Sequence, residues 1–284
     1  MNTHRPRINP LIERLRCSAT GNEIDDHDFQ RPIGLCNCCP APGRPVVIEY
    51  DLERAELGDS DRALGIWSFA DLLPVIDPAP SFAADVGITP IVEIEPWSRE
   101  LGVSVMVKNE GTNPSGSFKD RGLAAGIAFG AACGAERFCL PTQGNAGVAA
   151  SLFSARLGLP GCLVYMPEGY EDGLYHREAR YFGAEVRFFG PNIAAAGKKM
   201  REDAASELAS GAYVDMSTFF EPGRLEGKKT MGLEIFHHFG ADRLPDWILY
   251  PTGGGTGLVG IWKAFQELMG MGLIDPDRHR LPRM

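Results

Sequence analysis

The feature that most constrains the fold is a repeated order of apolar strand, Gly-containing turn and helix between residues 103 and 269. This order predicts an α/β fold with two lobes of mainly parallel sheet covered by helices, in which ligands bind at the carboxyl ends of the strands. Strands are expected at 103–108, 137–140, 161–166, 185–189, 213–214 and 247–250. Helices are expected at 118–133, 146–157, 177–182, 193–210, 227–239 and 258–269.

The length of 284 residues favours two domains over one. The segment 1–58 is polar, rich in Pro and contains four of the cysteines, so it is interpreted as an N-terminal appendage. Residues 59–130 together with 212–284 are predicted to form a larger, cofactor-binding domain. Residues 131–211 are predicted to form a smaller α/β domain.

Composition excludes several function classes. A net charge of −9 without a long Lys/Arg run argues against a nucleic-acid partner. No stretch approaches the roughly 20 apolar residues of a membrane span, so no membrane partner is expected and the location is predicted to be cytoplasmic. Cys133, Cys139 and Cys162 lie singly among apolar residues, which is typical of reduced thiols in a core rather than of a disulfide framework.

The turn at 251–257 follows an apolar strand and opens a helix. Its backbone N–H groups can converge on an anion at the positive end of the helix dipole, and the hydroxyl of Thr256 can add to them. The pattern is neither a nucleotide P-loop nor a dinucleotide fingerprint. It predicts a phosphate site, although a tight turn that needs positive φ would give the same pattern.

Lys119 stands at the start of a helix whose later residues are apolar. The helix dipole and desolvation both lower the pKa of a lysine in this position, which suits a lysine that acts as an amine or imine nitrogen. The alternative is an ordinary solvated lysine.

Two further turns carry polar groups. Asn145 follows the strand at 137–140, where it can direct its amide at a ligand ring or simply cap the next helix. The stretch 224–230 offers cations beside a predicted helix start, which suits an anionic substrate group but also fits a solvated helix face.

The N-terminal cysteines suggest a zinc ribbon with one incomplete pair. Cys36 and Cys39 form a C-x-x-C pair that encloses Cys38, but Thr20 stands where a partner of Cys17 belongs. His27 or Cys38 are candidates to complete the site. The favoured interpretation is a degenerate remnant without metal, so no metal-binding residue is predicted.

Four segments together resemble threonine synthase and, more broadly, the pyridoxal 5′-phosphate (PLP) enzymes that share the fold of the tryptophan synthase β subunit. They are residues 108–122, 143–147, 221–230 and 251–257, the last followed by the matching run 262–265. The resemblance extends from about Gly65 to the end of the chain, and the cysteines before Glu49 are similar to the Cys-rich start of some threonine synthases.

The resemblance implies a fold type II enzyme, a carbon–oxygen lyase that converts O-phospho-L-homoserine and water to L-threonine and phosphate. PLP would form a Schiff base with Lys119, and Asn145 would bind the ring hydroxyl. Arg224 and Thr142 would bind the substrate, a small phosphorylated amino acid, and a homodimer is expected. The cofactor phosphate would be held by Gly253, Gly254, Gly255, Thr256 and Gly257.

The sequence departs from the family pattern at three places. Gln143 replaces a small residue, and residues 85–90 match only in part. Relatives continue beyond the position of Met284 with a part that completes the larger domain, so the chain is expected to lack that part. Two alternatives to threonine synthase therefore stay open: another PLP lyase or dehydratase of the same fold, and a truncated, catalytically silent PLP-binding protein.

Overall fold

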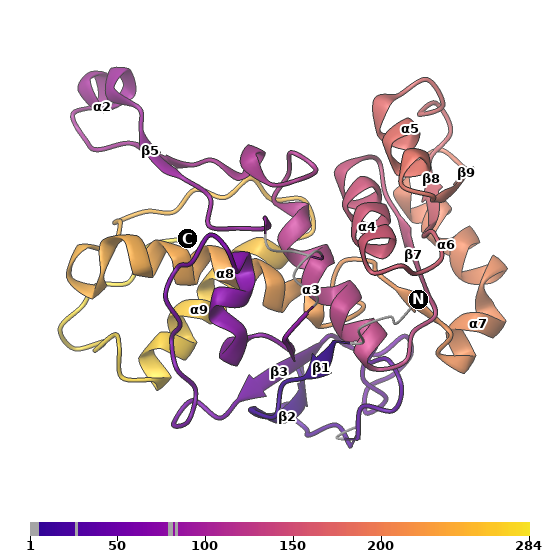
Figure 1. Cartoon of the computed structure of the whole chain (residues 1–284), viewed down its shortest axis with the longest axis horizontal. Coiled ribbons are helices and arrows are strands. Elements are labelled where there is room, and N and C mark those ends of the chain that lie inside the picture. Colours follow the sequence, from indigo (N-terminus) through magenta and orange to yellow (C-terminus); the bar gives the residue numbers. More distant parts are fainter. Residues whose placement is uncertain (1–5, 26–27, 79–81, 83–84) are drawn as a thin grey trace.

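The computed structural model describes residues 6–25, 28–78, 82 and 85–284. Figure 1 shows one region built around a parallel sheet on the right and a second, mainly helical region on the left. The strands of the parallel sheet run in the order β10-β7-β8-β9. They are β7 (Arg137–Pro141), β8 (Leu163–Met166), β9 (Glu185–Phe188) and β10 (Tyr213–Asp215).

Helices cover both faces of this sheet, because alternate residues of a strand point to opposite faces. Phe138 and Leu140 of β7 pack in the main core with α4, whereas Cys139 between them packs in a separate cluster with Ala196 and Met200 of α6. The covering helices are α4 (Asn145–Arg156), α5 (Leu174–Tyr181), α6 (Ile193–Asp203) and α7 (Ala205–Ser210). The predicted α/β fold with a parallel sheet is confirmed.

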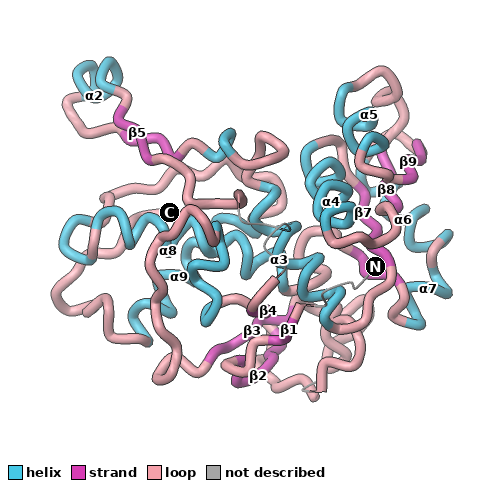
Figure 2. The backbone as a smooth tube through the Cα atoms, in the orientation of Figure 1, coloured by secondary structure: helices cyan, strands magenta, loops and turns pink. Residues whose placement is uncertain are grey.

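The second region is organised by three long helices, of which α8 packs against both α3 and α9. Around them the chain forms short antiparallel pairs, β1 with β4, β2 with β3, and β5 with β6. Figure 2 shows these short strands apart from the parallel sheet. The long helices are α3 (Lys119–Ala132), α8 (Gly223–Phe239) and α9 (Thr256–Gly270). The short elements are β1 (Arg7–Ile8), β2 (Ile12–Cys17), β3 (Val46–Tyr50), η1 (Gly65–Leu72), β4 (Val75–Ile76), β5 (Ile91–Glu93), α2 (Glu95–Leu101), β6 (Met106–Lys108), η2 (Glu110–Thr112) and η3 (Ala241–Arg243).

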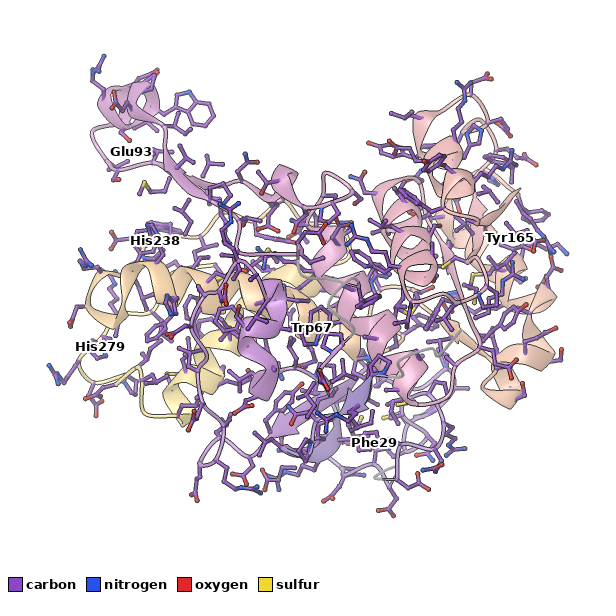
Figure 3. All side chains as sticks on the ribbon, in the orientation of Figure 1. Phe29, Trp67, Glu93, Tyr165, His238 and His279 are labelled. Atoms are coloured by element: carbon purple, nitrogen blue, oxygen red, sulfur yellow. The ribbon has the colours of Figure 1, made fainter. Side chains whose placement is uncertain are left out.

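The hairpin of β5 and β6, with α2 between them, projects from the upper left of the molecule, where Figure 3 labels Glu93. At the centre of the same view lies Trp67, which is buried and packs edge-on against Phe82 with ring centroids 5.9 Å apart. Within the described residues, no helix is long and apolar enough to cross a membrane.

Three sequence predictions are wrong in detail. The strand predicted at 247–250 does not form, because its backbone makes only an isolated bridge from Trp247 to Arg283 and Leu249 is 89% exposed. The single helix predicted at 193–210 breaks at Ala204, whose φ of −108° and ψ of 21° are not helical. The helix α8 begins at Gly223 rather than at 227. The proposed division into 1–58, 59–130 with 212–284, and 131–211 stays a prediction.

Candidate active site

A cavity of about 360 Å³ lies where α3, α8 and α9 begin and where β7 ends. Helix starts and the carboxyl ends of parallel strands are the places where backbone groups are free to bind ligands. The lining combines cations, hydroxyls and a glycine loop, and it holds no Asp or Glu among the described residues. The lining residues are Phe118, Lys119, Pro141, Thr142, Ala146, Ile193, Ala194, Arg201, Ser217, Thr218, Arg224, Lys228, Tyr250, Pro251 and Gly253–Gly257.

Close packing of α3 on α8 brings the cations together. A Cβ atom on Gly227 would lie 2.0 Å from the backbone oxygen of Arg121, and a Cβ on Gly122 would lie 2.8 Å from that of Arg224. Only glycine permits such a close approach of two helix backbones. As a result, Lys119 on α3 faces the same cavity as Arg224 and Lys228 on α8.

Lys119 is the first residue of α3 and is half-buried. Its Nζ lies 3.8 Å from the ring centroid of Phe118. Burial, together with the charge of Arg224, lowers the pKa of Lys119 to about 8. The neutral amine is therefore far more populated near neutral pH than in an ordinary lysine, as a nucleophilic or proton-transferring lysine requires.

Arg224 and Lys228 are both buried, at 4% and 3% exposure. Arg224 donates from Nη1 to the backbone oxygen of Met216, but its Nε has no hydrogen-bond partner among the described residues. Lys228 donates from Nζ to Oγ1 of Thr256 at 2.9 Å. Burial, followed by the charges of Arg224 and Lys119, lowers the pKa of Lys228 to about 6. Buried donors without an anion are costly, so the cavity suits an anionic ligand.

The glycine loop closes the cavity at the start of α9. Cβ atoms would collide at two of its glycines: on Gly254 a Cβ would lie 2.4 Å from Thr218, and on Gly257 it would lie 2.0 Å from the hydroxyl of Tyr250. Gly255 has a φ of 85°, a left-handed conformation that favours glycine. The loop thus presents its amides at the positive end of a helix dipole, next to the buried hydroxyl of Tyr250, which has no hydrogen-bond partner in the described part of the chain. These residues fit the phosphate of PLP.

The structure brings most of the predicted site residues together. Lys119, Thr142, Arg224 and the loop Gly253–Gly257 all line the one cavity. Asn145 does not line it: it is the first residue of α4 and half-buried, while its neighbour Ala146 reaches the cavity. The roles assigned to these residues stay predictions.

Sequence reasoning missed several lining residues. The sequence shows Lys228 only as one of several cations in the stretch 224–230. Its neighbour Gly227 permits the close contact of α8 with α3 and was the signal that could have singled it out. Tyr250 ends the strand predicted at 247–250. Its position just before the turn at 251–257 was the signal that could have placed it at the cavity. Ser217 and Thr218 follow β10, so the rule that ligands bind at strand carboxyl ends could have found them.

The N-terminal cysteines are arranged differently from the incomplete pair that the sequence suggested. The sulfur atoms of Cys17, Cys36, Cys38 and Cys39 all lie within 4.8 Å of one another. Cys38, rather than a residue at position 20, therefore supplies the fourth sulfur of the cluster. His27, the other candidate, lies outside the described residues.

Several proteins of known name are similar to this chain in sequence. The chain is 32% identical over 281 residues to a threonine synthase of Methanocaldococcus jannaschii, which covers 96% of this chain and 64% of the relative. It is 33% identical over 199 residues to a threonine synthase of Halalkalibacterium halodurans, with 70% of this chain and 54% of the relative covered. The chain thus spans between about half and two thirds of the length of these two relatives.

Solved structures show the same fold. O-ureido-L-serine synthase matches with a TM-score of 0.56 and 22% identity, over 66% of this chain and 58% of that chain. Threonine deaminase isoform 2 from Solanum lycopersicum matches with a TM-score of 0.54 and 21% identity, over 64% of this chain and 51% of that chain. The model of the family described as "Pyridoxal-phosphate dependent enzyme" matches residues 83–278. The chain, with its cationic cavity and glycine loop, belongs to this family of pyridoxal-phosphate-dependent enzymes.

Proposed function

We propose that this chain binds PLP at Lys119 and acts as a threonine synthase, converting O-phospho-L-homoserine and water to L-threonine and phosphate. The observation that carries the proposal is a cavity lined by basic side chains, whose charged forms an anionic ligand stabilises. Lys119, Arg224 and Lys228 all face it, and no lining residue that the structure describes is acidic. One cofactor phosphate leaves part of this charge uncompensated, and a phosphorylated substrate supplies the second anion.

The cofactor phosphate is assigned to the start of α9. The amides of Gly253–Gly257 and the hydroxyl of Thr256 bind its oxygens, and Lys228 stabilises the charge through its position 2.9 Å from that hydroxyl. Nζ of Lys119 is the point of covalent attachment. PLP supplies an electron sink for the substrate carbons when it is bound.

Lys119 also moves protons in this proposal. An amine with a pKa of about 8 accepts and returns a proton with little driving force lost near neutral pH. Its position at the start of α3 keeps Nζ in the cavity beside Phe118. The rigid packing of α3 against α8 therefore orients the proton-transfer group.

Arg224 and Thr142 are assigned to the substrate. The unpartnered Nε of Arg224 is a free charged donor for a phosphate oxygen. Glu221 compensates this charge only in part, because burial raises the pKa of its carboxyl to about 7. Thr142 is buried at the carboxyl end of β7 and lines the cavity, and its hydroxyl accepts from the backbone N–H of Gly144 at 3.1 Å. Asn145 is retained for the ring hydroxyl of the cofactor.

Arg224 also separates the alternatives. A dehydratase or another lyase of this fold acting on a substrate without phosphate has little use for a buried guanidinium whose Nε has no partner among the described residues. A silent PLP-binding protein would keep the cofactor site but would not turn over.

The test is phosphate release from O-phospho-L-homoserine by the PLP-loaded chain, with threonine measured in parallel. We expect equimolar phosphate and threonine. The variant Arg224→Leu is expected to lose about 10- to 100-fold in kcat/KM while retaining PLP, since one charge-assisted contact is removed. Formation of an oxoacid from serine or threonine instead of phosphate release favours the dehydratase. A folded, PLP-loaded chain with no turnover favours the silent protein.

We further propose that the chain works in the cytoplasm as a homodimer. The described cysteines all carry free thiols, as expected in a reducing compartment. The projecting hairpin exposes apolar side chains that include Trp97, Leu101 and Val103, which a second copy could cover. Sedimentation of the purified chain tests the dimer: a monomer at micromolar concentration contradicts it.

A further inference from the structure

The antiparallel pair of β2 and β3, with the loop that joins them, forms an N-terminal ribbon. This ribbon contains four cysteine thiols that do not line the cavity. Cys17 ends β2, whereas the other three lie in the loop that leads to β3. Cys17 and Cys36 are buried, Cys39 is half-buried and Cys38 is exposed. Sγ of Cys17 lies 3.7 Å from Sγ of Cys39, and all four sulfurs lie within 4.8 Å of one another.

Two tight loops hold the sulfurs in this arrangement. The backbone N–H of Cys17 donates to the oxygen of Asn22 at 2.9 Å, and that of Cys36 donates to the oxygen of Arg44 at 2.8 Å. Gly43 has a φ of 94°, and a Cβ there would lie 2.2 Å from the oxygen of Cys36. The second loop therefore requires glycine at this position, and the cluster is built into the backbone.

Donors are directed at the sulfurs. The backbone N–H of Arg44 lies 3.2 Å from Sγ of Cys36. The hydroxyl of Thr20 lies 3.7 Å from Sγ of Cys38. Donors of this kind stabilise thiolates, and they are the outer partners that orient and tune thiolate ligands around a metal.

We propose that Cys17, Cys36, Cys38 and Cys39 bind one zinc ion as four thiolates. Zinc takes four thiolates tetrahedrally at about 2.3 Å, which places neighbouring sulfurs about 3.8 Å apart. The separation of Cys17 and Cys39 already matches this value, and the remaining sulfurs need only a small contraction. The four thiols release their protons on binding, and the closed set of ligands leaves no open position for chemistry.

The role of this ion is to hold the ribbon against α8. Tyr50, at the end of β3, donates its hydroxyl to Glu226 at 3.1 Å, and its ring lies beneath Nζ of Lys229 at 4.1 Å. Both partners lie on the helix that carries Arg224 and Lys228. Zinc therefore stabilises the support of that helix and touches neither the cofactor nor the substrate.

The experiment uses the PLP-loaded full chain, purified under reducing conditions, with zinc measured by atomic emission. We expect about one zinc per chain, as for a Cys₄ site. Cys36→Ser and Cys38→Ser should each lose the metal. Cys139→Ala, a buried cysteine in a separate core cluster, should retain it. Removing zinc should lower the melting temperature, while the PLP absorbance of protein that stays folded is retained.

A second measurement keeps the proposal testable if the serine variants do not fold. Cobalt titrated into the zinc-depleted wild-type chain should give thiolate-to-metal charge-transfer bands and the visible bands of a tetrahedral ion, and zinc should displace it. A folded, reduced chain without zinc and without these bands contradicts the proposal. So does isolation with iron in place of zinc, a disulfide between Cys17 and Cys39, or zinc retained by both serine variants.

Discussion

Two adjacent lysines on α8 have opposite surroundings. Nζ of Lys229 lies 2.6 Å from Glu226 and 2.8 Å from Glu267, both of which are buried carboxylates. Nζ of Lys228 donates to the hydroxyl of Thr256 and lies 4.9 Å from the ring centroid of Phe118, and it has no carboxylate partner among the described residues. A rotation of about 100° between consecutive helix positions thus separates a lysine that is compensated within the chain from a lysine that faces the cavity.

The two buried arginines repeat the contrast. Arg121 on α3 makes ion pairs with Glu110 and Glu234, and it also donates to Thr230 at 2.9 Å. Arg224 on α8 donates to one backbone oxygen and keeps an unpartnered Nε. Burial of a charge is costly unless it is paired, so paired charges fix the helices in place while unpaired ones are retained for a ligand.

The largest loss of stability is expected when a buried charge loses its ion-pair partner. Glu234→Ala leaves Arg121 and Lys108 without their shared carboxylate, and removing one partner of a buried pair costs about 3–5 kcal/mol. Urea unfolding of the cofactor-free chain measures this loss. If the variant unfolds at the same urea concentration as the wild type, the network does not hold α3 on α8.

The uncompensated lysine should respond in the opposite way. Lys228→Met is expected to leave the stability of the cofactor-free chain unchanged or higher, because folding then no longer has to bury this amine and remove its proton. Its PLP affinity should fall by about 10- to 100-fold, which corresponds to a lost charge-assisted contact. Equilibrium dialysis measures the affinity.

The matched control is Lys229→Met. It leaves Glu226 without one of its two lysine partners, since Lys263 remains at 2.9 Å, and it should lower stability while the remaining folded protein binds PLP normally. If the two variants behave alike, the distinction between paired and unpaired charge is wrong.

Stability should depend on pH through Lys228. Its pKa is lowered from 10.5 to about 6 in the folded chain, so between these values the unfolded chain binds the extra proton. The free energy of unfolding therefore rises with pH, by at most about 1.4 kcal/mol per pH unit from this group. Below about pH 6 the contribution is constant, since both states are then protonated.

Comparing the cofactor-free wild type with Lys228→Met isolates the contribution of Lys228 to the pH dependence of stability. Urea unfolding at about pH 7 and about pH 9 should show the stability advantage of the variant shrinking as the pH rises. An advantage that grows with pH gives the wrong sign and contradicts the assignment.

The smallest loss of stability is expected at Tyr50, which borders the buried ion-pair cluster of Glu226, Lys229, Lys263 and Glu267. Tyr50→Phe removes the hydrogen bond to Glu226 but keeps the ring beneath Lys229, so it should cost about 1 kcal/mol. A shift of the thermal midpoint checks this value. No shift would show that the ribbon contributes to α8 through the ring alone.

Local patterns predicted the α/β fold and most of the cavity. The strand, turn and helix order located the starts of α3 and α9, and therefore Lys119 and the glycine loop. The sequence did not reveal which of Lys228 and Lys229 is paired, because Glu267 lies on another helix and far along the chain. The sequence left both Cys38 and His27 as candidates to complete the cysteine site for a similar reason: loop closure, rather than regular spacing, places the sulfur of Cys38 near Cys17.

The most direct test of the central claim is to reduce the PLP-loaded chain with borohydride and to map the labelled peptide. We expect a visible absorbance band that reduction removes, with the label on Lys119, the cavity lysine whose pKa is about 8. Label on Lys228 or Lys229, or no label in a folded protein, would contradict it.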